Sequence, residues 1–197
     1  MGKPDAQLVV EALGGDAKAF EEIIRRYQRL VFNIAYHYLG RRGEVEDLAQ
    51  QVFLKVYRSL GRFDTTRPLK AWIGRITSNA CLDEVRKHRA RKVSAFADLS
   101  QDEEERIHRG HSNAQAGGSL SDQEAEESFR LLYQAMGQLA EKDRLAFVLR
   151  EIEGMEYSEV AEALQASPVA ARIRVSRARK KLQESVKALL AKRGVAL

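Results

Sequence analysis

Apolar residues in the first part of the chain recur at intervals of three and four positions. This spacing predicts an amphipathic helix that begins after Asp16, its N-cap, and ends at Gly40. Its apolar stripe consists of Phe20, Ile23, Ile24, Tyr27, Val31, Ile34, Ala35 and Tyr38.

Two further helices are predicted before residue 92. The first carries apolar positions from Val45 to Leu60 and is closed by Gly61. The second begins at Leu69, after a loop at residues 63–68, and carries Trp72 and four other apolar residues on one side. Three long helices with short connections predict a compact all-α domain of three to four helices over residues 1–92.

Residues 93–127 differ from the segments on either side. They have little periodicity and are rich in charged residues, Gly and Ser, as in SQDEEER and HSNAQAGGSLSD. Residues 93–128 hold two basic and nine acidic residues, a net charge of −7. This composition predicts a flexible acidic linker between two small helical domains.

Helical periodicity resumes at Phe129 and is expected to end at Gly154, which makes residues 128–197 a second domain. A short helix over residues 156–164 and a tight turn follow. Ser167 can then cap a further helix whose first position is Pro168. The inward positions of that helix are Ala171, Val175, Ala178 and Leu182. A short helix, a tight turn and a second helix predict a helix-turn-helix.

The charge of the chain follows the same division. Residues 1–92 hold 18 basic and 11 acidic residues (+7), and residues 129–197 hold 13 and 8 (+5). Two basic blocks around an acidic segment favour two modules that bind a polyanion. The outward face of the last helix can bridge phosphates or contact base edges, including the methyl group of thymine through Ile173. That face comprises Arg172, Ile173, Arg174, Ser176, Arg177 and Arg179.

Catalytic and metal-binding patterns are missing from the sequence. It contains no GxxxxGK[ST], HExxH or CxxC, so we expect neither an enzyme nor a cofactor. His108 and His111 are three positions apart beside acidic residues, and a solvated linker is favoured there over a metal site. Cys81, the only cysteine, fits a small buried residue in a reducing cytoplasm. No apolar run approaches the roughly 20 residues that span a bilayer, and the N-terminus is not expected to be a signal peptide.

Five stretches of the chain resemble one bacterial family when they are taken together and in order. They are DLAQQVFLKVYRSLGRF, then Trp72, ITSNACLDEVRK, LAEKDRLAFVLREIEGMEYSEVAEALQAS and SRARKKL. In this order they resemble the extracytoplasmic-function sigma factors, over nearly all of residues 7–192. The resemblance implies a cytoplasmic initiation factor that binds RNA polymerase core and promoter DNA, without membrane insertion. An anti-sigma partner is also implied.

The resemblance assigns the first domain to core binding and to the −10 element. The helix around residues 47–58 would dock on core polymerase, and most of its candidates lie off the apolar stripe. These candidates are Asp47, Gln50, Gln51, Phe53, Leu54, Lys55 and Arg58. The following loop and helix would hold an unpaired −10 base in a pocket that includes Asn79, with Ile76 as an apolar wall. Trp72 is expected to be a core anchor and not a platform on which a base stacks. The −10 candidates are Phe63, Asp64, Thr65, Thr66, Arg67, Trp72, Ile76, Asn79, Asp83, Arg86 and Lys87, with Arg89, Arg91 and Lys92 expected along the phosphates.

The second domain would read the −35 duplex. Its candidates are Ser167, Arg172, Ile173, Arg174, Ser176, Arg177, Arg179 and Lys180. The chain departs from the family pattern at three places. Residues 170–175 lack the usual Thr and Ser, Gln165 stands at a common turn glycine, and Glu156 replaces a capping Ser. The −35 preference therefore does not carry over from the family.

Two other classes of function compete with the sigma-factor interpretation. A dimeric helix-turn-helix regulator would bind DNA without polymerase, but it leaves the surface over residues 47–55 unexplained. An enzyme of nucleic-acid metabolism would need a metal or nucleophile cluster, and the sequence contains none.

Overall fold

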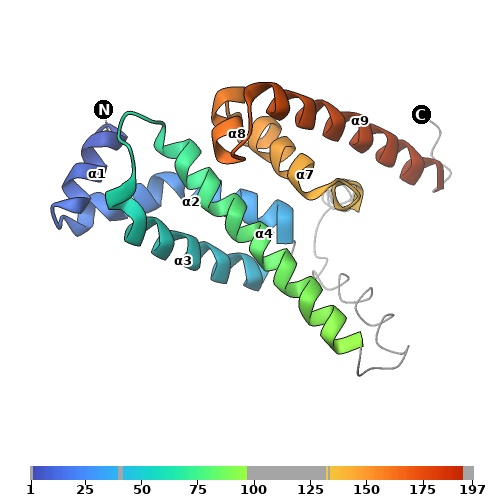
Figure 1. Cartoon of the computed structure of the whole chain (residues 1–197), viewed down its shortest axis with the longest axis horizontal. Coiled ribbons are helices and arrows are strands. Elements are labelled where there is room, and N and C mark those ends of the chain that lie inside the picture. Colours follow the sequence, from blue (N-terminus) through green and yellow to red (C-terminus); the bar gives the residue numbers. More distant parts are fainter. Residues whose placement is uncertain (1, 40–41, 97–131, 133, 193–197) are drawn as a thin grey trace, which may run out of the picture.

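The computed structural model describes residues 2–39, 42–96, 132 and 134–192, and every regular element among them is a helix (Figure 1). The predicted all-α fold is confirmed. The first module contains α1 (Asp5–Leu13), α2 (Ala17–Leu39), α3 (Arg42–Ser59), the 3-10 turn η1 (Leu60–Arg62) and α4 (Leu69–Phe96). The second contains α7 (Glu141–Phe147), the π-helical turn η3 (Val148–Ile152), α8 (Tyr157–Ala163) and α9 (Pro168–Lys192).

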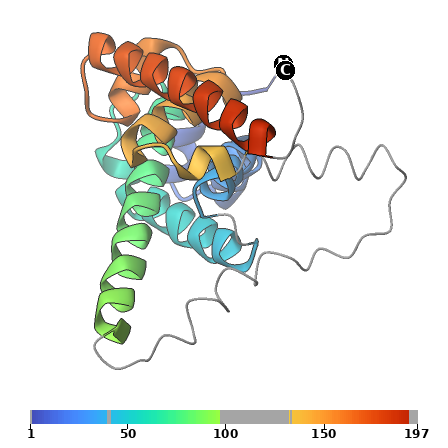
Figure 2. The ribbon, with the colours of Figure 1, turned by 90° about the vertical axis from the view of Figure 1, so that its right-hand side faces the viewer.

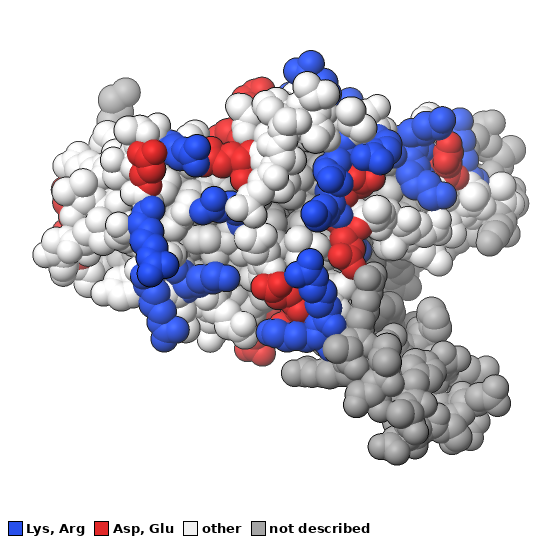
Figure 3. Space-filling model, viewed as in Figure 1, with Lys and Arg blue, Asp and Glu red and all other residues white. Residues whose placement is uncertain are grey.

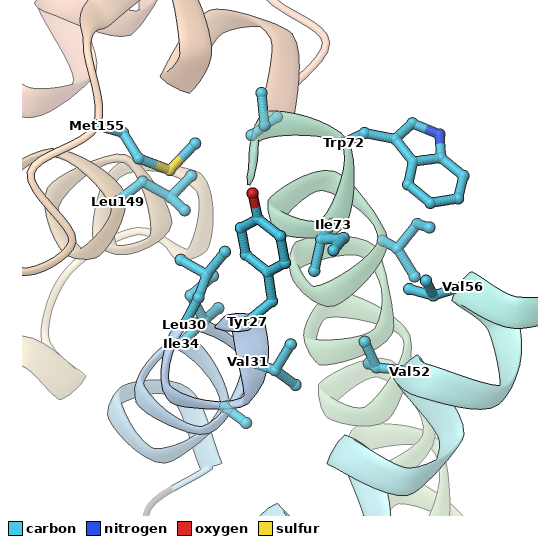
Figure 4. Packing of buried hydrophobic residues seen from close by; sticks show 14 of the residues in the cluster. Tyr27, Leu30, Val31, Ile34, Val52, Val56, Trp72, Ile73, Leu149 and Met155 are labelled. Atoms are coloured by element: carbon cyan, nitrogen blue, oxygen red, sulfur yellow. The ribbon is translucent and has the colours of Figure 1, made fainter. Parts of the chain in front are cut away.

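The three long helices of the first module lie where the apolar periodicity predicted them. The Asp16 carboxylate accepts the backbone N–H of Lys18 at 2.9 Å and so caps α2. Ile23, Val52 and Ile73, from α2, α3 and α4, are each fully buried in the common core. Figure 4 shows these helices with their side chains pointing toward one another.

Helix α1 was not predicted. Its nine residues are too few to show the helical period clearly. Leu8 and Val9 are buried, in a helix that packs on α2 and η1. Asp5 links α1 to α2, because its carboxylate accepts hydrogen bonds from the Arg26 guanidinium and from the Tyr27 hydroxyl.

The second module has the predicted helix-turn-helix. Ser167 Oγ accepts the backbone N–H of Ala170 at 3.1 Å and caps α9. Ala171, Val175 and Ala178 are buried, as the periodicity required. The turn before α9 places Gln165 at φ +50°, the left-handed region that favours glycine.

One boundary in the second module differs from the expectation. The predicted helix up to Gly154 is interrupted, because Ala140 is extended (φ −60°, ψ 141°) and α7 starts afresh at Glu141. In the apolar series of this segment, Leu139 is followed by Leu145 six positions later, and this gap in the helical spacing coincides with the interruption.

The two modules pack directly on each other, which the sequence did not predict. Helix α8 lies against the first half of α4, while α7 and η3 contact α2 (Figures 1 and 2). One buried apolar cluster runs without interruption from Leu8 in α1 to Val175 in α9. The far half of α4 projects away from both modules (Figure 2).

Helix α4 extends to Phe96, four residues into the segment assigned to the linker. The remainder of that segment, residues 97–127, lies outside the described residues, and so do His108 and His111. Across the described ranges no helix is long and apolar enough to cross a membrane. The same ranges contain no cluster of three His, Cys, Asp or Glu side chains that could hold a metal ion.

Candidate nucleic-acid interface

The outer face of α3 is exposed in the way that a partner surface requires. Asp47, Gln50, Gln51, Lys55 and Arg58 are all exposed. Among them stands Leu54, whose side chain is 54% exposed. A single exposed leucine is ordinary on a protein surface, but Leu54 lines one groove together with Tyr57, which is 59% exposed, and contiguous apolar surface of this kind is typical of a partner site.

Two grooves border this face. One, of about 630 Å³, lies between α2 and α3 and is lined by Phe20, Phe32, Phe53 and Tyr57. Phe53 is half-buried, with its ring packed on the core, so this core-binding candidate contributes to the groove wall and to stability.

The second groove, of about 590 Å³, lies between α3 and α4. It is bordered by residues predicted for two separate tasks: Lys55 and Arg58 from the core-binding set, and Asp83 and Lys87 from the −10 set. Arg62 is a further basic residue on its wall, and sequence reasoning missed it. The structure thus brings polymerase and DNA candidates to the two sides of one basic groove.

The loop before α4 is held in shape by Asp64. Its Oδ1 accepts the backbone N–H of Thr66 at 3.0 Å and the Thr66 hydroxyl at 2.7 Å. These hydrogen bonds, led by the hydroxyl, lower the pKa of Asp64 below its ordinary value. The Phe63 ring packs on Trp72 with centroids 5.0 Å apart. The loop is therefore a preformed turn, whose tip exposes Thr65 and Arg67.

Along α4 the −10 candidates separate into buried and exposed groups. Trp72 and Ile76 are each only 7% exposed, so Trp72 is a core anchor as predicted and Ile76 offers little open wall. The exposed candidates are Asn79, Asp83, Arg86 and Lys87, while the side chains of Arg89, Arg91 and Lys92 lie outside the described residues.

The arginines of α9 are held by partners that the sequence did not identify. Arg174 Nη1 lies 3.2 Å from Asp143 Oδ1 of α7, and both side chains are largely buried, at 26% and 14% exposed. Arg177 Nε approaches the same carboxylate at 3.8 Å, but its side chain is 63% exposed. Asp143 therefore anchors α9 to α7 and leaves Arg177 accessible.

Two further arginines of α9 also have neighbours in the second module. The Arg172 guanidinium lies 5.0 Å from the centre of the Tyr157 ring, and Arg179 pairs with Glu151 at 2.7 Å. On the face of Figure 3, basic side chains stand next to acidic ones instead of forming an unbroken basic surface. These contacts orient the cations and reduce their conformational freedom before DNA arrives.

Two apolar side chains stand exposed at the start of α9. Val169 is 68% exposed and Ile173, one helical turn later, is 50% exposed. Ser176, Arg177 and Lys180 are exposed further along the helix. Sequence reasoning missed Val169, although its four-residue spacing from Ile173 was a signal that both lie on one face.

Comparison with known proteins points to one family over both modules. Residues 23–91 match the family described as sigma-70 region 2, and residues 129–182 match sigma-70, region 4. Over 193 residues the chain is 28% identical to the RNA polymerase sigma-H factor of Pseudomonas aeruginosa, covering 94% of this chain and 95% of that relative. Identity to the ECF RNA polymerase sigma-E factor of Escherichia coli is also 28%, covering 94% of this chain and 96% of the relative.

Two solved structures are similar over most of the chain. The sigma factor RpoE in complex with the anti-sigma factor NepR from Bartonella quintana gives a TM-score of 0.66 at 25% identity, covering 87% of this chain and 98% of that one. CnrH in complex with the cytosolic domain of CnrY also gives 0.66, at 24% identity, and covers 93% of this chain and 97% of that one.

Proposed function

The chain is an extracytoplasmic-function sigma factor of the sigma-70 family that directs promoter-specific transcription initiation, and we propose how its residues divide that work. The first module docks on polymerase core and holds the melted −10 strand. The second module reads the −35 duplex. The main support for this division of roles is the exposed first half of α9. There Arg172 and Arg177, each oriented by a neighbouring side chain, flank the exposed apolar side chains of Val169 and Ile173.

At the −35 element, the exposed arginines and the apolar pair have different roles. Arg177 and Lys180 bind phosphates of the DNA backbone, which contributes to the affinity for DNA but does not distinguish one base sequence from another. Arg172, oriented by Tyr157, reaches a base edge, where a guanidinium can donate two hydrogen bonds to guanine. Val169 and Ile173 pack against the methyl groups of neighbouring thymines. Arg174 stays with Asp143 and keeps α9 in place.

At the −10 element, the preformed loop and the exposed amide of Asn79 hold an unpaired base. An extruded base costs a few kcal/mol to unstack, so a turn that is already ordered before binding lowers the remaining cost of capture. Arg62, Arg86 and Lys87 guide the phosphates of the separated strand. Binding therefore weakens steeply with added salt.

The exposed face of α3 docks on polymerase core. Its polar residues surround Leu54, which supplies the apolar contact at the centre of the interface. We place this activity in the cytoplasm, where polymerase core and promoter DNA are found. An anti-sigma factor acts as a further partner, since RpoE and CnrH, which are similar in fold, were each solved with a partner bound.

Reconstituted transcription tests the proposal. The purified protein and core polymerase should form a complex and start specific transcripts from a subset of cognate genomic fragments, while core alone starts none. Leu54→Glu should abolish the complex, with the solvent-facing change Glu21→Gln as the control. Tight binding of a palindromic operator by the protein alone, without any transcript in the presence of core, would instead support the dimeric regulator.

A further inference from the structure

Tyr157, the first residue of α8, contacts arginines from two other elements of the second module. The guanidinium of Arg150 in η3 lies 4.7 Å from the centre of the Tyr157 ring, and the guanidinium of Arg172 in α9 lies 5.0 Å from it. The ring is half-buried and packs against the core. Helix α8 lies beside the start of α9 (Figure 1). An aromatic side chain from the first helix of the helix-turn-helix thus contacts a DNA-binding candidate on the second helix.

The Tyr157 ring is held in place by its surroundings. Arg150 Nη1 donates a hydrogen bond to the backbone oxygen of Met155 at 2.7 Å, which fixes the guanidinium on which the ring packs. The Tyr157 hydroxyl lies beside Arg179, whose pKa is raised above its ordinary value by the Glu151 carboxylate first and by this hydroxyl to a lesser extent. Arg179 itself pairs with Glu151 at 2.7 Å. These contacts restrict rotation of the Tyr157 side chain.

Glu156 reduces the repulsion between the two cations that share the ring. Its Oε1 lies 3.4 Å from Arg150 Nη1. Because this carboxylate offsets the charge of Arg150, the electron-rich face of the ring remains attractive to Arg172. The family pattern has a capping serine at position 156, and a serine carries no charge that could do this. The arrangement is therefore a property of this chain and does not follow from the family resemblance.

The contact of Arg172 with the ring differs in kind from the ion pairs of its neighbours on α9. Arg174 and Arg179 use N–H donors to bind carboxylates, at 3.2 Å and 2.7 Å. Contact with a ring face uses none of the five N–H donors of a guanidinium. Arg172 is therefore oriented before DNA binds, and this contact leaves its donors available for the two parallel hydrogen bonds that guanine accepts.

We propose that Tyr157 is a positioning residue for −35 recognition, whose ring holds the Arg172 guanidinium in the orientation that reads one base pair. This role rests on the −35 reading proposed above. A guanidinium that is held in place cannot turn to another acceptor when the base pair is wrong, whereas a free one can. The base preference at that position therefore depends on a residue that lies outside the recognition helix and contacts no base itself.

Base preference measured with the reconstituted holoenzyme tests this role. Promoter duplexes that carry each base pair in turn at every −35 position give the preference at each position as a ratio of affinities. Arg172→Ala identifies the position that Arg172 reads, because the preference should fall there alone. Tyr157→Leu should lower the preference at this same position about two- to fivefold, as expected for the loss of one exposed cation–π contact, and leave the other positions unchanged.

Three further variants separate positioning from packing. Tyr157→Phe keeps the ring and should retain the preference. Tyr157→Leu combined with Arg172→Ala should show no further loss of preference beyond that of Arg172→Ala, because the two residues act through one contact. Ser158→Ala changes the next residue of α8, which is exposed, and is the matched control. Partial unfolding cannot imitate the effect, because a ratio of affinities from one preparation does not depend on its active fraction.

Other results would contradict this role of Tyr157. If Tyr157→Leu weakens binding to every sequence alike, the ring only supports the fold of the module. If Tyr157→Phe loses the preference as well, the hydroxyl acts and the ring does not position Arg172. If Arg172→Ala relaxes the preference at no position, the assignment of Arg172 to base reading fails instead, and Tyr157 has no base-reading side chain to position. These failures are distinguishable from one another.

Discussion

Replacing Arg174 or Arg177 by alanine separates the structural arginine of α9 from a DNA-binding one. Both approach the Asp143 carboxylate, at 3.2 Å and 3.8 Å, but their side chains are 26% and 63% exposed. Because the two side chains differ in exposure, we expect the two alanine substitutions to impair different properties of the protein, although they are only three positions apart. Arg174→Ala should reduce stability, and Arg177→Ala should reduce DNA binding.

The expected loss of stability follows from the geometry of the pair. Two unit charges 3.2 Å apart attract by about 5 kcal/mol at an effective dielectric constant of about 20. Desolvation of two largely buried groups offsets most of this attraction. Arg177 remains beside Asp143 after Arg174 is removed, so no buried charge is left alone. A net loss of about 1–2 kcal/mol remains, which corresponds to a fall in Tm of about 2–8 °C.

Urea unfolding and DNA binding at several salt concentrations provide the measurements. Arg174→Ala should lower the free energy of unfolding by that amount and leave the salt dependence of promoter binding unchanged. Arg177→Ala should change stability by less than about 0.5 kcal/mol. It should weaken holoenzyme binding to different −35 sequences alike and reduce the salt slope by about one. If Arg174→Ala keeps full stability but relaxes base preference at one −35 position, Arg174 reads DNA and the assignment is refuted.

Three other substitutions test single features of the chain. Gln165→Gly should raise the free energy of unfolding by about 0.5–1 kcal/mol, because φ is +50° in that turn; unchanged or reduced stability in urea would contradict this. Burial lowers the pKa of His37 below 6.5, so the unfolded chain takes up a proton first and stability should fall as pH decreases from about 7 through 6.5. His37→Gln should flatten this decline in Tm against pH, and an identical slope would argue against His37 as its source. Asn79→Ala should weaken open-complex formation, detected by permanganate reactivity of unpaired thymines, more than it weakens binding to intact duplex; equal losses would count against the pocket.

Much of the candidate site was predictable because its residues lie close together in the chain. Ser167 caps α9 as a Ser–Pro start predicts, and the Asp47–Arg58 face is outward because the apolar stripe of α3 occupies the opposite side. The partners of the site residues were not predictable. Asp143 and Arg174 are 31 residues apart, and nothing in the local pattern of either residue points to the other.

The sequence alone determined the helices, the inward and outward residues of each, and the helix-turn-helix, since these depend on interactions across one or two helical turns. It also carried the family resemblance, which consists of local motifs in a fixed order. Only the tertiary structure decided that Arg67 meets Glu162, that α8 packs on Gly74, and that candidates for polymerase and for DNA border one groove. Such contacts depend on where the chain brings distant helices together, and periodicity within one helix carries no record of the surface against which its apolar face packs.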